Sequence, residues 1–342
     1  MSNLHWAPFA HATVVSKGFV DGTAFAADAQ SLEDVLVSRQ ACVVACGVFD
    51  GIHMGHRRLV EDAVAHARRE RRMCVIVTFD PDPSEVLGAD GELGQRLLPF
   101  RDRVEGLLSL GVDIVLAYHF TPEFGALSPD AFVIDHLLKM VQVASVHIGV
   151  NFRYGMGGAG SPEHMHLVGA RYGFDVVVHP LECMAGSAVS ATRIRTCLAR
   201  GRLNEANELL GRCHYVRGRV VHGRGEGTGF GFPTANVLCD PCDRLPSQGV
   251  YACYVTCDDQ AWPAAVNVGK PPTFTDDDVA FLEANLVGFE GDLYGADVAV
   301  SFVAWLRASR CFDSIEELKN TVMGNVSWVR EHLGTGAMEV AR

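Results

Sequence analysis

The chain has 342 residues, of which 48% are hydrophobic and 20% charged, a balance typical of globular proteins and enough chain for two domains. Its 41 acidic and 29 basic residues give a formal net charge of −12, which argues against a general nucleic-acid binder, because such proteins depend on excess lysine and arginine. No apolar run approaches the ~20 residues of a membrane span, and the N-terminus lacks the features of a signal peptide, so we expect a cytoplasmic protein with no membrane partner.

The N-terminal half alternates buried strands with amphipathic helices. The apolar run at residues 41–48 predicts a strand covered on both faces, and residues 56–71 place their apolar side chains on one helical stripe. A further strand at 73–79 completes a strand–helix–strand unit within about forty residues, which predicts parallel pairing. The alternation continues with helices near 100–110, 128–140 and 162–172 and strands at 112–118, 143–150 and 174–179, and a strand near 12–16 precedes it. We therefore expect an α/β fold with a doubly wound, Rossmann-like parallel sheet.

The hydrophobic pattern of the sequence changes after two short helices, which we expect at 190–200 and 203–211. Short β-rich runs broken by glycine and proline then predict an antiparallel barrel or sandwich, with runs at 214–222, 249–257, 280–289 and 298–304. A terminal helix is expected over about 314–333, beginning at the cap Asp313-Ser314. We place the domain boundary near residue 200, with one domain at 1–200 and the other at 201–342.

Eleven cysteines are scattered along the chain, and one group of them could bind a metal. Cys239 and Cys242 form a C-x-x-C pair followed by Cys253 and Cys257, which loosely fits a four-thiolate zinc site. The last two are four residues apart on a predicted strand and are therefore not close neighbours. We interpret the buried cysteines as small hydrophobic side chains, and the role of the C-x-x-C pair stays open.

The strongest local motif is GVFDGIHMGH at residues 47–56, between the first buried strand and its helix. A glycine-rich turn lets backbone amides approach an anion, and the helix N-terminus adds about half a positive charge. His53 and His56 can donate hydrogen bonds to nucleotide phosphates, while Gly55 keeps the turn free of side-chain obstruction. We predict a phosphate-binding site here, rather than an incidental pair of histidines.

This motif resembles the H-x-G-H signature of nucleotidyltransferases, which transfer an adenylyl group from ATP without a covalent enzyme intermediate. Four further segments resemble bacterial FAD synthetases, namely TFDPDPSEVL (78–87), FTPEFGALSPDAFV (120–133), VNFRYGMGGAG (150–160) and VSATRIR (189–195). The resemblance implies in-line attack of the FMN phosphate on the α-phosphorus of ATP, with Mg²⁺ bridging the departing pyrophosphate. It implies catalytic roles for His53, His56 and Arg193, and ATP or flavin contacts for Phe49, Asp50, Gly51, Gly55, Asn151, Ser190 and Thr192.

Two positions depart from that family. Asp82 stands where the family's PHP turn has a histidine, and Ala191 replaces the second serine of its SSTRIR-like motif. The first is a candidate change in metal or ribose contacts. We expect the second to be tolerated, because Thr192 and Arg193 remain.

The second strong motif is GFGFPTANV at residues 229–237, which resembles the riboflavin kinase signature G-x-P-T-A-N. Further segments match that family in the same order, at 249–255, 265–274, 281–295 and 302–312. The resemblance implies an antiparallel β-barrel with a terminal helix, fused to a FAD synthetase module. It implies ATP contacts from Gly231 and Pro233, Mg²⁺ contacts from the oxygen-bearing side chains of Thr234 and Asn236, and proton acceptance from the flavin 5′-hydroxyl by Glu283.

The C-terminal half differs more strongly from the riboflavin kinase family, because it lacks several of that family's basic residues. Neither Glu226 nor Thr228 is basic where the phosphate-binding stretch often is, and Pro271 and Asn285 replace a common arginine and a common histidine. Two nearby cations could supply the missing charge, Arg224 or Lys270.

We therefore predict a bifunctional enzyme that phosphorylates riboflavin to FMN and adenylylates FMN to FAD, with ATP, Mg²⁺ and the flavins as its small-molecule partners. Two alternatives stay open. One is a monofunctional FAD synthetase whose barrel binds flavin without kinase activity, and the other is a non-catalytic flavin-binding regulatory protein. The oligomeric state, the metal preference and the redox state required of the flavin stay undetermined.

Overall fold

A computed structural model describes residues 4–10, 13–88, 95–222, 234–269, 281–310 and 312–340. The chain forms two compact units, each described here by itself. The α/β unit comprises Phe9–Gly94 and Phe100–Ser190, and the barrel unit comprises Met1–Pro8, Gln95–Pro99 and Ala191–Arg342.

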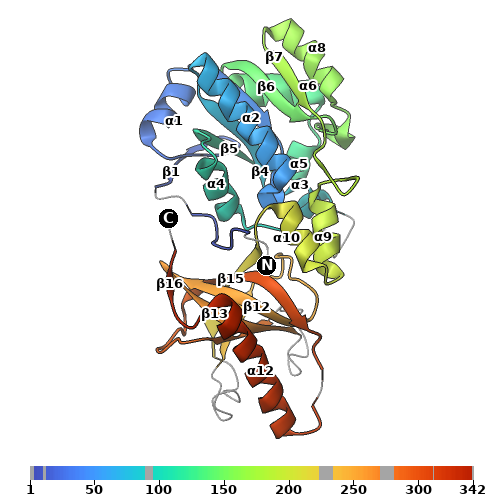
Figure 1. The fold of residues 1–342 in the computed structure, drawn as a ribbon. Coiled ribbons are helices and arrows are strands. Elements are labelled where there is room, and N and C mark those ends of the chain that lie inside the picture. The colour runs from blue at the N-terminus through green and yellow to red at the C-terminus, as the bar shows by residue number, and fades with distance from the viewer. Residues whose placement is uncertain are drawn as a thin grey trace. The chain divides into compact units, whose positions relative to one another are not determined.

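The α/β unit is built on a seven-stranded sheet (Figure 1). Five strands pair in parallel, in the order β5 (Ile114–His119), β4 (Cys74–Asp80), β3 (Cys42–Cys46), β6 (Val143–Gly149) and β7 (Asp175–His179). A hairpin of β1 (Val15–Phe19) and β2 (Gly22–Ala26) extends the sheet antiparallel to β5. The predicted α/β fold with its parallel sheet is confirmed. Of the antiparallel hairpin, the sequence predicted only one strand, near residues 12–16.

Burial explains why these segments form strands and helices. Every side chain of β3 is buried, as its continuous apolar run predicted. Helix α2 (Met54–Glu70) packs against β3, β4 and β6 through a stripe of buried side chains at Leu59, Val60, Ala63 and Ala67. The other long helices of the unit are α1 (Ala29–Leu36), α4 (Phe100–Ser109) and α8 (Pro162–Tyr172).

Shorter elements shape the loops of this unit. They are η1 (Asp50–Ile52), α3 (Pro83–Leu87), α5 (Pro122–Gly125), η4 (Met156–Gly158), β8 (Cys183–Met184) and β9 (Ser187–Ala188). The helix expected at 128–140 is interrupted by a π-helical segment, η3 (Phe132–Leu137), between α6 (Pro129–Ala131) and α7 (Leu138–Met140). Phe132 in this segment is buried. Because π-helical turns often occur at functional sites, the segment is a candidate part of a ligand site.

Six strands of the barrel unit close into an antiparallel barrel. Their order is β12 (Gly249–Cys257), β15 (Asp297–Arg307), β10 (His214–Val221), β11 (Ala235–Cys239), β14 (Phe281–Leu286) and β13 (Gln260–Gly269), and the β12–β13 pairing closes the ring. A short strand, β16 (Met338–Glu339), pairs with β13. Closure pairs every barrel strand on both sides and so removes the open edges of a sheet.

The terminal helix α12 (Ile315–Leu333) begins at Ser314, whose hydroxyl accepts a hydrogen bond from the Glu317 N–H at 3.1 Å. Its buried Val326 and Val329 belong to an apolar cluster that includes Tyr254 of β12. The predicted barrel with a terminal helix is therefore confirmed. Helices α9 (Ala191–Ala199) and α10 (Leu203–Leu210) precede the barrel in the same unit.

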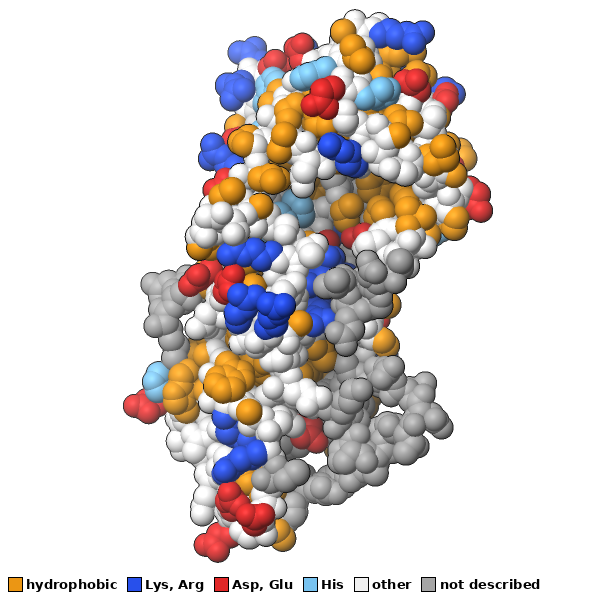
Figure 2. Space-filling view, turned by 90° about the vertical axis from the view of Figure 1, so that its right-hand side faces the viewer, with side chains coloured by type: hydrophobic (Ala, Val, Ile, Leu, Met, Phe, Trp, Pro, Cys, Tyr) orange, Lys and Arg blue, Asp and Glu red, His pale blue; other side chains and the backbone are white. Residues whose placement is uncertain are grey.

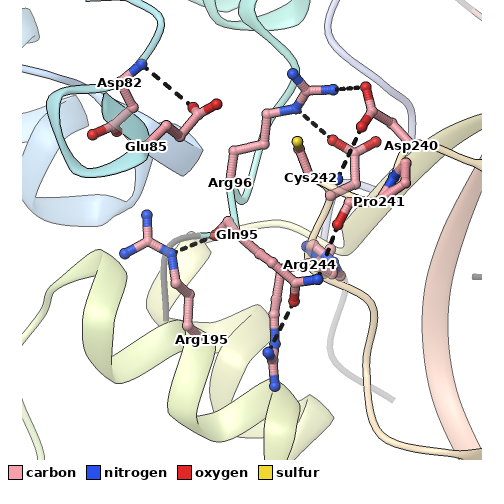
Figure 3. A network of polar contacts seen from close by, with 11 residues as sticks. Asp82, Glu85, Gln95, Arg96, Arg195, Asp240, Pro241, Cys242 and Arg244 are labelled. Atoms are coloured by element: carbon pink, nitrogen blue, oxygen red, sulfur yellow. Dashed lines mark hydrogen bonds and ion pairs between the residues drawn. The ribbon is translucent and has the colours of Figure 1, made fainter. Parts of the chain in front are cut away.

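Residues 95–99 belong to the barrel unit, although the chain on both sides of them belongs to the α/β unit. The Arg96 guanidinium donates to Asp243 and to Asp240, each at 2.6 Å, and its backbone N–H donates to the Cys242 carbonyl at 2.8 Å (Figure 3). Arg195 of α9 donates to the Gln95 carbonyl at 2.6 Å. This polar network holds the segment against the turn that follows β11.

The same turn contains the C-x-x-C pair. Cys239 is buried at the end of β11, and burial raises the pKa of its thiol to about 12. Cys242 is exposed, and its backbone N–H donates to the Asp240 carboxylate at 2.9 Å. The turn therefore anchors residues 95–99 through its carbonyl and carboxylate groups.

Candidate active sites

The turn before α2 has an unusual backbone. Phe49 and Ile52 have φ angles of 58° and 41°, in the left-handed region that non-glycine residues rarely adopt, and Gly51 between them has φ 75°. Phe49, Asp50 and Ile52 are buried, so the surrounding structure holds this conformation. Such outliers cluster at functional sites, which supports a ligand-binding role for the turn.

His53 and His56 meet at the start of α2. His53 Nδ1 accepts a hydrogen bond from the His56 N–H at 3.3 Å and so caps the helix. The two imidazoles stack with centroids 3.6 Å apart and planes at 17°, and the Phe49 ring meets His56 edge-on at 5.3 Å. A Cβ on Gly55 would lie only 3.3 Å from the His53 ring. Glycine at this position therefore lets the two imidazoles pack against the turn, as predicted from the sequence.

The surroundings of His56 keep its imidazole neutral. Burial, then the neighbouring His53 and Arg103, hold the pKa of His56 well below its usual range. Its Nδ1 is buried and has no hydrogen-bond partner within the described residues. At neutral pH this ring can therefore donate one hydrogen bond without carrying a charge.

A cavity of about 510 Å³ opens beside this turn. Phe49, His56 and Asn151 line it, so three of the predicted site residues share one space. Its other walls are largely aromatic, with Phe79, Phe120, Phe124, Phe132, Phe152 and Tyr154. Figure 2 shows hydrophobic side chains gathered around a hollow in the α/β unit. An aromatic cavity of this size suits a flat heteroaromatic ring.

The loop after β6 forms another wall of this cavity and depends on glycine. Gly155 has φ 70°, and a Cβ there would lie 2.7 Å from the backbone nitrogen of Pro129. Gly158 also has a positive φ, of 68°. Only glycine combines this conformation with this close approach, which explains the VNFRYGMGGAG string.

Arg103 supports the backbone of this site, and the sequence did not single it out. Its side chain is buried on α4 and donates to the carbonyls of Val48 at 2.7 Å and Phe79 at 3.0 Å. Burial lowers its pKa, while nearby carboxylates, first Asp50 and then Asp82, oppose that shift. On a predicted amphipathic helix an arginine is normally assigned to the solvent face, so no sequence signal marked it.

Asp82, the residue at the position of the family's histidine, caps α3. Its carboxylate accepts from the Ser84 N–H and hydroxyl, each at 2.8 Å. Glu85 accepts from the Asp82 N–H at 3.3 Å, which completes a capping box (Figure 3). In this chain the Asp82 side chain therefore stabilises the N-terminus of α3.

The remaining predicted residues of the first site are described in different units. Asp50 and Gly51 lie in the η1 turn, and Ser190 ends the α/β unit. Thr192 and Arg193 lie in the first turn of α9 in the barrel unit, where Arg193 forms an ion pair with Glu205 at 2.9 Å. The joint action of Ser190, Thr192 and Arg193 with His53 therefore stays a prediction.

A second cavity, of about 260 Å³, lies in the barrel unit between α12 and the outer side of strands β12–β15. Thr234, Glu283 and Asn285 line it, and Asn236 stands directly opposite Glu283 in the β11–β14 ladder. Several predicted or weighed positions lie outside the described residues, namely Arg224, Glu226, Thr228, Gly231, Pro233, Lys270 and Pro271.

Two arginines supply positive charge to this second cavity, Arg307 and Arg310. Both guanidinium groups lie over the Phe312 ring, at 5.5 and 5.0 Å from its centroid, and Arg310 forms an ion pair with Glu317 at 3.0 Å. Burial, and then Arg310, lower the pKa of Arg307, and its buried Nε has no hydrogen-bond partner within the described residues. The sequence suggested other cations for this role, although the string at 302–312 contains both of these.

Comparisons with known proteins match both units. A FAD synthetase family model matches residues 36–193, and a riboflavin kinase model matches residues 210–333. The bifunctional riboflavin kinase/FMN adenylyltransferase of Listeria monocytogenes is 33% identical over 81% of this chain and 87% of its own length. The protein of the same description from Escherichia coli K12 is 34% identical over 86% of this chain and 94% of its own length.

The fold is also found in a solved structure. A crystal structure described as a macrolide-efflux protein from Streptococcus pneumoniae has a TM-score of 0.77 and 28% identity, and the match covers 85% of this chain and 94% of that one. Within the part of the chain that the structure describes, no helix has the length and apolar character needed to cross a bilayer.

Proposed function

Because the chain belongs to the bifunctional riboflavin kinase/FMN adenylyltransferase family, and so makes FMN from riboflavin and FAD from FMN with ATP, we propose that its two units divide these reactions. The α/β unit adenylylates FMN, and the barrel of the other unit phosphorylates riboflavin. The two family models support this division, since each matches one of the two folds. The domains predicted from the sequence, residues 1–200 and 201–342, differ from these units at residues 1–8, 95–99 and 191–200.

The adenylyl transfer relies on the turn before α2. An oxygen of the FMN phosphate attacks the α-phosphorus of ATP in line, a new P–O bond forms, and the bond to the leaving pyrophosphate breaks. The α2 N-terminus, His53 and the neutral His56 donate hydrogen bonds to the phosphates. Asn151 and the aromatic cavity hold the flavin side of the reaction. The stacked imidazole pair, of which His56 lines this cavity, is the observation that carries the proposal.

The kinase reaction relies on Glu283. Its carboxylate accepts the proton of the riboflavin 5′-hydroxyl, whose oxygen attacks the γ-phosphorus of ATP as the bond to ADP breaks. Arg307 and Arg310 line the same cavity and place positive charge near the transferred group. Asn285 at the position of a common histidine contributes an uncharged amide to the cavity.

The side chains around Glu283 also fit Mg²⁺. Thr234 shares the cavity of Glu283, and Asn236 stands opposite it, so hydroxyl, amide and carboxylate oxygens are neighbours. These are the ligand types that Mg²⁺ prefers, usually together with substrate phosphates. We propose that Thr234 and Asn236 hold the ion, whose bound charge would offset that of the phosphates.

Product analysis tests the assignment of both activities. The full chain is incubated with ATP, Mg²⁺ and either riboflavin or FMN, and the flavins are separated by chromatography. We expect FMN and FAD from riboflavin, and FAD from FMN. FAD from FMN alone would instead support the monofunctional alternative, and formation of neither product would support the non-catalytic one. The cytoplasmic location expected from the sequence stays a separate prediction.

A further inference from the structure

Three adjacent strands of the barrel place polar side chains in one row. Glu283 of β14 stands directly opposite Asn236 of β11 on one side and Asn267 of β13 on the other. Residues directly opposite in an antiparallel ladder project to the same face, with Cβ atoms about 4.5–5.5 Å apart. The candidate base is therefore flanked by two amides. Asn236 belongs to the predicted metal site, whereas the sequence assigned no role to Asn267.

Asn267 contacts Glu283 through one end of its amide. Its Nδ2 donates to Glu283 Oε2 at 3.4 Å, and its Oδ1 accepts from the Ser309 hydroxyl at 3.1 Å. All three side chains line the cavity of about 260 Å³. An ionised carboxylate only accepts hydrogen bonds, so Asn267 must turn its NH₂ group toward Glu283. The Ser309 hydroxyl satisfies the oxygen end of the amide in this orientation.

Glu283 needs such a partner because it is exposed. A glutamate side chain has several rotatable bonds, and fixing it in one geometry costs conformational entropy. A general base works only within hydrogen-bond reach of the proton that it takes. On its other side Asn267 faces Val250 in the β12–β13 ladder, which offers no side-chain hydrogen bond. The amide therefore directs its polar contacts to Glu283 and Ser309.

We infer that Asn267 is a positioning residue for the kinase reaction, and that Ser309 anchors its side chain. The inference rests on the proposed role of Glu283 as the base. Asn267 holds Oε2 of Glu283, which leaves Oε1 to accept the proton of the riboflavin 5′-hydroxyl while the hydroxyl oxygen bonds to the γ-phosphorus and ADP departs. Ser309 acts only through the Asn267 amide.

The variant Asn267→Asp tests this inference, because it keeps the size of the side chain and the oxygen that accepts from Ser309. It replaces the donor to Glu283 with an oxygen that repels the carboxylate. We expect kcat for FMN formation to fall by about tenfold to a hundredfold, with KM for riboflavin and ATP changed less than about threefold. Ser309→Ala should lower kcat by a smaller factor, and Ser309→Thr, which keeps the hydroxyl, should restore it. Matched controls on the exposed side of α12 are Asn320→Asp and Ser327→Ala.

A double-mutant comparison separates this role from a general effect on the barrel. Adding Asn267→Asp to Glu283→Ala should cause less than about a twofold further loss, because residues that act as a unit are not additive. An equal loss in both backgrounds, or wild-type kcat in Asn267→Asp, would overturn the positioning role. Wild-type FMN formation by Glu283→Ala alone would overturn the proposed base. FAD formation from supplied FMN is measured in every variant and should not change.

Discussion

At the scale of single residues, both candidate sites depend on how neighbours constrain one reactive side chain. His56 stacks on His53 at 3.6 Å, in surroundings that hold its pKa well below its usual range. Glu283 is exposed but lies between two amides in the barrel ladder. Burial therefore keeps His56 neutral, whereas Glu283 accepts a hydrogen bond from one of its flanking amides, that of Asn267.

His56 provides the residue-scale prediction. His56→Ala should lower the rate of FAD formation from FMN by about 10²–10³-fold, because a preorganised donor to the reacting phosphates is lost. FMN formation from riboflavin should stay at its wild-type rate. Both rates are measured on the same preparation, with His166→Ala on the exposed face of α8 as the matched control. Equal loss of both activities would contradict two separate sites.

At the scale of elements, a chain of histidines joins α2 to strands β6 and β7. His66 of α2 bonds to His147 of β6 at 2.8 Å, and His147 bonds to His179 of β7 at 2.9 Å. Glu70 contacts His66 at 3.0 Å, and Asp62 contacts His179 at 3.6 Å. This chain ties the helix that carries the H-x-G-H motif to the sheet beneath it.

Burial, and then the neighbouring His179 and His66, lower the pKa of His147 from 6.5 to about 3. The unfolded chain therefore binds a proton that the folded chain does not, between these two values. The stabilising contribution is complete above about pH 6.5 and is lost as the pH falls toward 3. Arg69 also faces His147 and, like the other histidines, disfavours its protonation.

We predict that the free energy of unfolding of the α/β unit falls between pH 7 and pH 5. His147→Gln, which cannot be protonated, should reduce that fall by about 2 kcal/mol, since one pKa unit corresponds to about 1.4 kcal/mol. Urea denaturation at both pH values measures the difference, and His166→Gln on the surface is the control. An identical pH dependence in wild type and His147→Gln would show that His147 does not titrate in this way.

At the scale of the whole molecule, the two units are not two consecutive pieces of chain. The barrel unit includes Gln95–Pro99, and the α/β unit continues from Phe100. Arg96 in this segment bonds to Asp243, whose side chain is 4% exposed. A buried carboxylate of this kind needs a partner for its charge. The barrel unit therefore relies on a segment from the first half of the sequence.

Replacement of this arginine tests that dependence. Arg96→Met should lower the free energy of unfolding of the barrel unit by about 3–5 kcal/mol, because the buried Asp243 would lose the guanidinium that donates to it at 2.6 Å. Denaturant unfolding followed by tryptophan fluorescence reports on the barrel unit, which contains all four tryptophans of the chain, Trp6, Trp262, Trp305 and Trp328. Arg330→Met on the exposed side of α12 should change the value by less than about 0.5 kcal/mol. A similar small change in Arg96→Met would contradict the role of the segment.

The sequence by itself determined the α/β fold, the closed β-rich domain and the family, because periodicity and contiguous motifs are local properties of the chain. The family resemblance also assigned Phe49, His56 and Asn151 to one site, and these three residues line one cavity. Only the tertiary structure decided that Arg103 is buried, that Arg96 belongs to the barrel unit and that Asn267 joins Ser309 to Glu283. Each of these facts depends on which distant segments pack together, and no local pattern of side chains encodes that choice.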